Sequence, residues 1–334
     1  MKRTVILALI TIALGLSMWN RSQNGKFVRQ ENQLLGTVVS LTFYGNQSNA
    51  KAASDEIFDD LYKINETINI FDAKSEISQL NRTAASQPFV CSDLLWGFIQ
   101  EGRKAYTLTD GRFDVSVAPL MSLWGLHKKQ NHWPSKALVA EALSKVGLNK
   151  IKFDDQKQSV KFSVPGMKLD FGGLVKGIAL DRCRQIMQKH GIEVGLANLG
   201  GNIYCTSKAP EGRDSFLVGI KNPSAGLSDT IKVNGCFVAT SGDYERYTSI
   251  DGRRIAHIIN PLTGYPVEQV AAVSVITQTG VDSDLFSTTL FVDRKHTLNR
   301  LKSVEPGLEY MVIIHKAGGY IYETLGKKWH KDLR

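Results

Sequence analysis

The stretch that decides the fold runs from Ala239 to Val267 and reads ATSGDYERYTSIDGRRIAHIINPLTGYPV. Glycines, an Asn-Pro pair and a Gly-Tyr-Pro turn punctuate it, which predicts short strands joined by tight turns. His257 stands in an apolar run with the aliphatic neighbours typical of a β-strand. Thr240, Ser241 and Thr263 place hydroxyl groups near this histidine in sequence. The combination indicates a functional site more than a plain core.

The residues alone support two interpretations of His257. An isolated histidine in an apolar run is commonly a core residue with its ring nitrogens hydrogen-bonded. Alternatively, the ring acts as a general base or orients a reacting hydroxyl, because imidazole titrates near neutral pH. Both interpretations stay open at this point.

In a second stretch, VDSDLFSTTLFV over residues 281–292, acidic side chains come directly before an apolar run that suits a helix. If residues 280–292 form a loop followed by a helix, Asp284 and Thr288 lie one turn apart on the same face. A carboxylate, a hydroxyl and backbone carbonyls are the oxygen ligands that Mg²⁺ prefers. The competing interpretation is that Asp282 and Asp284 are acids of the kind that any helix start favours. We treat the two stretches as one predicted site, a histidine beside a metal.

The segment LDFGGLVKG, residues 169–177, predicts a strand, two glycines and Lys176 just before a helix over residues 178–190. The backbone NH groups of such a turn and the helix N-terminus both favour a phosphate. The spacing matches neither the P-loop nor the dinucleotide-binding GxGxxG pattern. Tight packing of a strand against a helix explains the two glycines equally well.

Another turn, TDGRFD at residues 109–114, places Asp114 before an apolar segment. Its carboxylate can cap the next helix, which is the favoured interpretation from the residues alone. Alternatively, the carboxylate accepts hydrogen bonds from a heterocycle or a ribose.

The chain has 334 residues, of which 43% are hydrophobic and 22% are charged, as in ordinary globular proteins. This length allows one large domain or two smaller ones. The net charge of +9 favours an anionic ligand such as a phosphate ester. Lysines and arginines are scattered, and no basic block is interleaved with aromatic residues, which argues against a nucleic-acid-binding protein.

Residues 1–22 form a separate unit in which a basic start, MKR, precedes an apolar run from Val5 to Trp19 and a polar stretch. This pattern predicts either a cleaved signal peptide or an N-terminal anchor to the inner membrane over residues 1–20. The run is short for a full span, which needs roughly 20 residues. Both alternatives place the rest of the chain in the periplasm. No cysteine follows the run, so a lipoprotein attachment site is missing.

The four cysteines form no CxxC pair, and none has a histidine at ligand spacing. A zinc site is therefore not expected. In an oxidising compartment one disulfide could form, although buried single thiols are the favoured state. The cysteines are Cys91, Cys183, Cys205 and Cys236.

Apolar periodicity predicts several helices and many short strands after residue 27. The expected helices cover residues 48–70, part of 71–81, 92–109, 135–146 and 178–190. The expected strands cover residues 33–45, 151–153, 160–162, 167–171, 194–201, 216–220, 230–233, 236–239 and 271–277, with a closing hairpin at 308–314 and 319–323. Short strands mixed irregularly with helices indicate an α+β fold rather than a βαβ series. No repeat or linker divides residues 27–334, so a single domain is expected.

Eight short motifs occur in an order that is specific as a set. They are LGT at 35–37, SEISQLN at 75–81, GRFD at 111–114, LDFGGLVKG at 169–177, NLGGN at 198–202, TSGDY at 240–244, HIINPLTGYP at 257–266 and DLFST at 284–288. With these motifs the chain resembles the ApbE family of FAD:protein FMN transferases over about residues 33–325.

The resemblance implies an α+β fold related to the T-fold, with mostly antiparallel sheets, packed helices and two lobes around a flavin cleft. It implies an enzyme that uses Mg²⁺ and takes FAD as a substrate. Such an enzyme transfers FMN through its phosphate to a Ser or Thr hydroxyl of a target flavoprotein and releases AMP. Targets in the family include subunits of sodium-pumping quinone reductases and related electron-transport proteins. The alternatives are a pyrophosphatase that converts FAD to FMN and AMP, and a non-catalytic periplasmic FAD carrier.

The resemblance also implies roles by position. His257 matches the histidine beside the reacting phosphate and forms the implied catalytic pair with Asp284. The implied metal ligands are Gly173, Asp284, Ser287 and Thr288, with backbone oxygens contributing near the glycine and the serine. The implied contacts to FAD are Leu35, Phe71, Asp72, Ala73, Asp114, Lys176 and Ile258.

Two departures from the family pattern stand out. Leu35 occupies a position where the family usually has Met, an apolar exchange compatible with cofactor binding. The lipoprotein cysteine common in the family is absent, which bears on anchoring rather than on chemistry.

Overall fold

The computed structural model describes residues 24–127, 130, 132–221, 223, 227–244, 247–305 and 307–329. The predicted signal peptide or anchor, residues 1–22, lies outside these residues. Within the described part of the chain, no helix combines the length and the apolar character needed to cross a bilayer.

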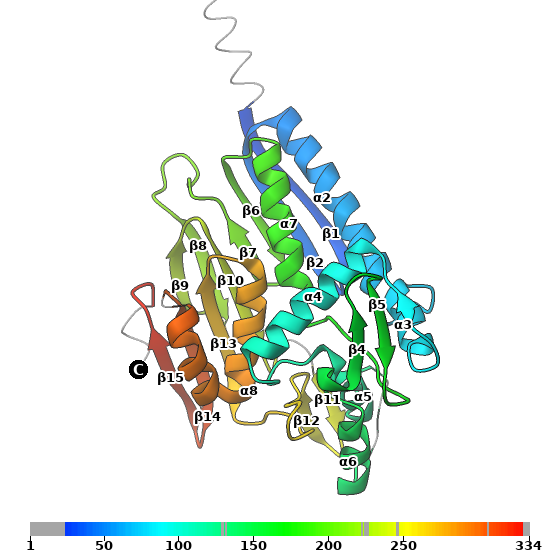
Figure 1. The fold of residues 1–334 in the computed structure, drawn as a ribbon. Helices are drawn as coiled ribbons and strands as arrows, with labels where there is room; N and C mark the ends of the chain where they lie inside the picture. The colour runs from blue at the N-terminus through cyan, green and yellow to red at the C-terminus, as the bar shows by residue number, and fades with distance from the viewer. Residues whose placement is uncertain are drawn as a thin grey trace, which may run out of the picture.

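The framework of the molecule is an eight-stranded sheet in which every neighbouring pair of strands is antiparallel. The strand order is β1-β2-β6-β7-β10-β13-β14-β15, so segments far apart in sequence meet at its centre (Figure 1). All eight residues of β13 are buried, as expected for a strand covered on both faces. The strands are β1 (Asn24–Leu34), β2 (Thr37–Asn46), β6 (Val194–Leu199), β7 (Asn202–Cys205), β10 (Cys236–Gly242), β13 (Val270–Thr277), β14 (Glu309–Lys316) and β15 (Gly319–Leu325).

Three helices cover one face of this sheet (Figure 1). The first packs on β1 and β2, the second on β6 and β7, and the third on β10 and β13. Each buries an apolar side against the sheet, which is the main source of helix stability in a globular protein. The helices are α2 (Gln47–Ile68), α7 (Val175–Lys189) and α8 (Gly280–Val304).

The opposite face of the sheet carries a separate apolar cluster. A hairpin formed by β8 (Phe216–Lys221) and β9 (Leu227–Val233) contributes alternate buried residues to it. Trp329 near the end of the described chain contributes as well.

A smaller lobe stands beside the sheet, and we call it the small lobe. Its core surrounds Trp124, which is completely buried. The Trp124 indole donates a 2.7 Å hydrogen bond to the carbonyl oxygen of Gly264, which ties the lobe to the segment after β12. The small lobe consists of η1 (Val115–Val117), α5 (Ala118–Leu123), α6 (Lys136–Ser144), β11 (Tyr247–Ile250) and β12 (Arg253–Ala256).

The remaining elements join the helical face of the sheet to the small lobe (Figure 1). Two further helices precede the small lobe in sequence, and a three-stranded sheet of order β3-β5-β4 lies near them. The elements are α3 (Glu76–Thr83), β3 (Phe89–Val90), α4 (Asp93–Leu108), η2 (Leu148–Lys150), β4 (Ile151–Asp154) and β5 (Ser159–Phe162).

The predicted α+β class is confirmed, with antiparallel sheets and seven α-helices in the described part of the chain. The helices expected over residues 48–70, 92–109 and 135–146 and the closing hairpin are present within one or two residues. The four cysteines are buried, and the structure shows them as thiols.

Three local predictions were wrong. The strand expected over residues 33–45 is two strands, because Leu35 and Gly36 turn the chain with φ angles of 52° and 69°. Residues 167–171 form no strand, since the backbone of Leu169 is hydrogen-bonded by the side chain of Asn81 instead of a neighbouring strand. His257 follows β12 rather than lying in a strand.

Two helix starts also differ from expectation. The loop expected at the start of residues 280–292 is absent, because Gly280 is already the first residue of the helix. Thr279 caps this helix by accepting from the NH of Asp282. The helix predicted from residue 178 begins at Val175.

Helices α7 and α8 approach closely at Gly177. A Cβ atom at this position would meet the carbonyl oxygen of Gly280 and would lie 2.9 Å from the Cβ of Asp284. The absence of a side chain therefore sets the distance between the first turns of the two helices.

We expect Gly177→Ala to destabilise the protein by about 1–3 kcal/mol, because the added methyl group forces the two helices apart. Gly97→Ala is the matched control, since Gly97 is an exposed glycine of α4 with open space around its Cβ position. It should be neutral or stabilising by up to about 1 kcal/mol. Denaturant unfolding measures both, and equal stabilities for the two variants would contradict the close approach.

Candidate functional site

A cavity of about 520 Å³ opens where the helical face of the sheet meets the small lobe. Its walls come from the β1–β2 turn, the end of α2, the chain from η1 to α5, the segment before α7, and residues of β10, β11 and α8. Its size is typical of small-molecule sites, which are commonly found between structural units. The cavity is therefore the candidate functional site.

Nine of the predicted site residues line this one cavity: Leu35, Phe71, Asp114, Gly173, Lys176, His257, Ile258, Asp284 and Thr288. Three others do not line it. Asp72 and Ala73 are exposed in the turn after Phe71, where the Asp72 carboxylate accepts from the NH of Lys74. Ser287 is fully buried behind the wall.

Asp284 is the best-anchored polar group of the cavity. One carboxylate oxygen accepts a 3.0 Å hydrogen bond from the NH of Gly177, in the first turn of α7. The other accepts a 2.8 Å bond from the side-chain amide of Asn202, at the start of β7. A carboxylate from α8 thus caps the N-terminus of α7, where the helix dipole favours a negative charge.

Burial dominates the electrostatics of Asp284, whose side chain is only 4% exposed. Burial raises the pKa of this carboxyl. The charge of Lys176 and the hydrogen bonds that the carboxylate accepts oppose that rise. The ammonium of Lys176 donates to the side-chain oxygen of Asn202 at 3.1 Å. Asn202 therefore links the Lys176 ammonium to the Asp284 carboxylate at this end of the cavity.

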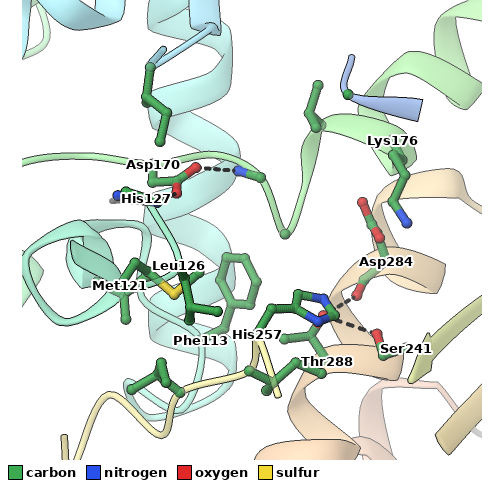
Figure 2. A pocket seen from close by; sticks show the side chains of 18 of the residues that line it. Phe113, Met121, Leu126, His127, Asp170, Lys176, Ser241, His257, Asp284 and Thr288 are labelled. Atoms are coloured by element: carbon green, nitrogen blue, oxygen red, sulfur yellow. Dashed lines mark hydrogen bonds and ion pairs between the residues drawn. The ribbon is translucent and has the colours of Figure 1, made fainter. Parts of the chain in front are cut away.

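The hydroxyl groups of Thr288 and Ser241 lie close to Asp284 in the cavity (Figure 2), and the hydroxyl of Ser287 lies behind the wall. Thr288 and Ser287 donate to the carbonyl oxygen of Asp284 at 3.0 Å and 3.1 Å, as helical hydroxyls often do. Ser241 of β10 lies 2.9 Å from the Ser287 hydroxyl and 3.5 Å from that of Thr288. The end of the cavity is thus rich in oxygen atoms from two different elements.

This donor set suits Mg²⁺ better than a transition metal. No group of three His, Cys, Asp or Glu side chains that could hold a metal ion occurs among the residues that the structure describes. Mg²⁺ is commonly bound by one or two carboxylates, with substrate phosphates and water completing its shell. Asp284 and Thr288 offer a carboxylate and a hydroxyl to the cavity, and the desolvated carboxylate gains from a nearby cation. The residues present therefore fit a magnesium ion that arrives with a phosphate ligand.

His257 lies at the same end of the cavity as Asp284, Thr288 and Ser241 (Figure 2). Ala256 and Ile258 on either side of it are buried, whereas His257 is partly exposed and lines the cavity. Ile258 and Ile259 are buried and also line the cavity, and the imidazole of His257 is the polar group that this run brings to it. This placement supports the functional interpretation of His257 over the core interpretation.

The sequence suggested that glycine NH groups before α7 would hold a phosphate. The NH of Gly172, before α7, instead donates to the carboxylate of Asp170 at 2.8 Å. The NH of Gly177, in the first turn of α7, donates to the carboxylate of Asp284 at 3.0 Å. Lys176 therefore remains the main positive charge from this segment that faces the cavity.

Asp114 caps the next helix and also lines the cavity, so both interpretations of this residue are compatible. Its carboxylate accepts from the NH and the hydroxyl of Ser116 at 2.7 Å and 2.6 Å. Burial raises the pKa of Asp114 from 3.8 to about 6, and the two bonds from Ser116 offset only part of this rise. The group can thus change its protonation state near neutral pH.

A second polar pair lies at the other end of the cavity (Figure 2). The Nε2 atom of His127 is 2.9 Å from a carboxylate oxygen of Asp170, and its Nδ1 atom is 3.2 Å from the hydroxyl of Ser122. Phe71 stands edge-on to the His127 ring with 5.8 Å between ring centroids, and 70% of Phe71 is exposed. This end thus combines an exposed aromatic ring with a fixed imidazole.

Sequence reasoning missed several residues that line the cavity or support its wall. Asn202 belongs to a quoted motif, but no local signal pointed to its bond with Asp284, 82 positions away. The His127–Asp170 pair likewise joins residues 43 positions apart. Phe113 lies between the two ends of the cavity and beside Gly173, where an added Cβ would lie 2.9 Å from the Phe113 ring.

Comparison with known proteins gives concordant results. The model of the ApbE family matches residues 35–312. An FAD:protein FMN transferase of Klebsiella pneumoniae is 30% identical over 262 residues, covering 77% of this chain and 80% of the relative. One of Chlamydia trachomatis is 32% identical over 249 residues, covering 72% and 75%. The crystal structure of the ApbE protein from Thermotoga maritima superposes with a TM-score of 0.81 at 29% identity, covering 90% of this chain and 97% of the other.

The raised pKa of Asp114 predicts a pH-dependent stability. A carboxyl whose pKa is higher in the folded state stabilises the fold below the unfolded value of 3.8, and this contribution is lost as the pH rises through about 6. At about 1.4 kcal/mol per pKa unit the loss is about 3 kcal/mol. Part of this loss has already occurred at pH 4, so the free energy of unfolding of wild type minus that of Asp114→Asn should fall by about 2 kcal/mol between pH 4 and pH 7. Parallel curves over this range would show that the carboxyl is not desolvated.

Proposed function

This chain belongs to the ApbE family, and from that membership together with the geometry of the cavity we propose that it is an FAD:protein FMN transferase. It transfers FMN from FAD to a Ser or Thr hydroxyl of a target protein and releases AMP. The observation that supports this most strongly is that His257, Lys176, Asp284 and Thr288 line one end of one cavity. Transfer of a phosphoryl-linked group from a diphosphate requires a base, a fixed cation and ligands for magnesium.

The chain's own residues divide the work at the diphosphate. Asp284 and Thr288 would hold Mg²⁺, which would neutralise negative charge on the phosphate oxygens. Lys176 places its ammonium at the same end of the cavity, held there by Asn202, and adds a second positive charge. Because Asp284 is buried, water screens charges weakly at this end of the cavity, and electrostatic stabilisation there is strong.

His257 manages the proton. The acceptor hydroxyl oxygen forms a bond to the FMN-side phosphorus while the bond from that phosphorus to the bridging oxygen breaks. The bridging oxygen leaves with AMP, and the proton of the acceptor hydroxyl passes to the imidazole. An imidazole is suited to this step because its unperturbed pKa lies near neutral pH.

The rest of the cavity binds the two ends of FAD. Leu35, Phe71 and Ile258 offer apolar or aromatic surface to the rings, and Asp114 offers a carboxyl that can accept or donate a hydrogen bond. We take the opening between the helical face of the sheet and the small lobe as the flavin cleft, in a fold related to the T-fold.

The place of action and the acceptor are part of this proposal. The basic and apolar start of the chain, residues 1–22, supports export to the periplasm or attachment to the inner membrane. The acceptors would then be flavoprotein subunits exposed there, such as those of sodium-pumping quinone reductases. The decisive experiment mixes the purified protein with FAD, Mg²⁺ and an acceptor peptide and looks for an FMN-sized mass addition to the peptide.

The same experiment separates the alternatives. A pyrophosphatase would release free FMN and AMP at the same rate with and without the acceptor. A carrier would bind FAD and leave it intact in every sample. Either result would replace the proposed transfer activity.

We expect His257→Ala to lower the rate of FMN transfer by roughly 10²–10⁴-fold, since proton transfer by a positioned side chain contributes about this much. FAD affinity, followed by flavin fluorescence, should change little. The matched control is His190→Ala. The Nε2 atom of His190 lies 2.7 Å from a carboxylate oxygen of Glu56, and this pair does not line the cavity. Full transfer activity in the His257 variant with normal FAD binding would exclude the catalytic role.

We expect Asp284→Asn to abolish the Mg²⁺ dependence of FAD binding and to lower transfer by at least about 10²-fold, because the amide keeps the shape but not the charge. The control is Asp282→Asn, two positions away on α8 and outside the cavity, which should keep both properties. Titration of FAD fluorescence with and without Mg²⁺ reports binding separately from turnover. Unchanged Mg²⁺ dependence in the Asp284 variant would place the metal elsewhere.

A further inference from the structure

Two of the four cysteines lie directly opposite each other in the central sheet. Cys205 is the last residue of β7 and Cys236 is the first residue of β10, and the antiparallel register pairs them. Both side chains belong to the apolar cluster on the face of the sheet opposite the helices, so they point to the same side. The other two cysteines, Cys91 and Cys183, lie in the core on the helical face.

The geometry of this pair suits a disulfide. Residues directly opposite in an antiparallel pair have Cα atoms about 4.5–5.5 Å apart, within the 4.4–6.8 Å typical of disulfides. Their Cβ atoms are about 4.5–5.5 Å apart, so bond formation requires an approach of about 1 Å. The sulfur of Cys205 already lies 3.7 Å from the carbonyl oxygen of Cys236, turned toward the partner strand.

The position of the pair is a weak junction of the sheet. The β7–β10 ladder consists of three residue pairs, whereas β6–β7 has four and β10–β13 has six. Both strands carry residues of the cavity region, because β7 begins with Asn202 and β10 contains Ser241. A covalent bond here would hold the two parts of the candidate site in one register.

We propose that Cys205 and Cys236 form a disulfide when the chain folds in the presence of a disulfide oxidant, either a protein or a small molecule. The exchange oxidises the two cysteine thiols to one S–S bond and reduces the disulfide of the oxidant to two thiols, which take up the two protons. The bond closes a loop over residues 206–235, which contains the β8–β9 hairpin.

Burial decides when the bond forms. Cys205 and Cys236 are 0% and 1% exposed, so an oxidant reaches them during folding, before the cluster around them closes. The same burial then shields the finished bond from reductants. Cys91 and Cys183 are equally buried but have no opposed cysteine, which makes them internal controls.

The test counts thiols in the full chain. Reduced, denatured protein is first refolded with glutathione disulfide. One half of the sample is then reduced and the other half is not, and both are denatured with excess maleimide. Intact mass spectrometry counts the maleimide adducts in each half. The proposal predicts two maleimide adducts without reduction and four after it, with a peptide map that joins Cys205 to Cys236. Four adducts without reduction, or a bond that includes Cys91 or Cys183, would overturn it.

Thermal unfolding provides a second test. Closing a loop of this length should raise Tm on the order of 5 °C in the oxidised protein relative to the same protein refolded with reductant. Cys91→Ala/Cys183→Ala should keep this difference, and Cys205→Ala/Cys236→Ala should lose it. Equal Tm values for oxidised and reduced wild type would contradict a stabilising bond.

Should the Cys205→Ala/Cys236→Ala variant fail to fold, the thiol count of the wild type still decides whether the bond forms. Neither test involves FAD, so this inference and the proposed transfer activity can fail separately.

Discussion

One buried carboxylate organises the structure around the cavity. Asp284 projects from α8, caps the first turn of α7 through the NH of Gly177, and accepts from Asn202 at the start of β7. Three elements, of which α8 is far from α7 and β7 in sequence, therefore converge on one charged group. Removing a carboxylate from water is costly unless hydrogen bonds and positive charge compensate for it. Two hydrogen bonds, the α7 dipole and Lys176 supply part of that compensation, and a bound divalent cation would supply more.

The close approach of the two helices follows from the same constraint. The carboxylate can reach the first turn of α7 only because Gly177 has no side chain to separate the helices. The sheet beneath them fixes the hydroxyl of Ser241 opposite α8, so the oxygen atoms gather without a loop to position them. Groups carried by packed helices and strands are held more precisely than groups on loops. His257 is the exception, since it lies just after β12, between buried neighbours that restrict it.

Features with a local signal could be predicted from the sequence. The four-residue spacing of Asp284 and Thr288 placed both on one face of a helix, and both line the cavity. The aliphatic neighbours of His257 are buried as expected, although the strand proposed for it ends one residue earlier. The family resemblance added the order of the motifs, and the match over residues 35–312 agrees with it.

Features that depend on distant contacts could not be predicted in this way. Leu35 adopts a left-handed conformation that leucine disfavours, and only the pairing of β1 with β2 requires it. The extended segment before α7 takes its hydrogen bonds from the side chain of Asn81, which no period-two pattern reveals. The His127–Asp170 pair and the link between Asn202 and Asp284 exist only once the fold has formed.

The central claim is that Asp284 and Thr288 hold a divalent cation beside a dinucleotide diphosphate and His257. Anomalous diffraction from crystals soaked with Mn²⁺ and FAD tests this most directly, because manganese takes the oxygen ligands of magnesium and is visible by its anomalous signal. The account predicts an anomalous peak about 2.2 Å from the Asp284 carboxylate and the Thr288 hydroxyl, in contact with the diphosphate. A manganese ion elsewhere in the molecule, or a diphosphate bound away from His257, would contradict it.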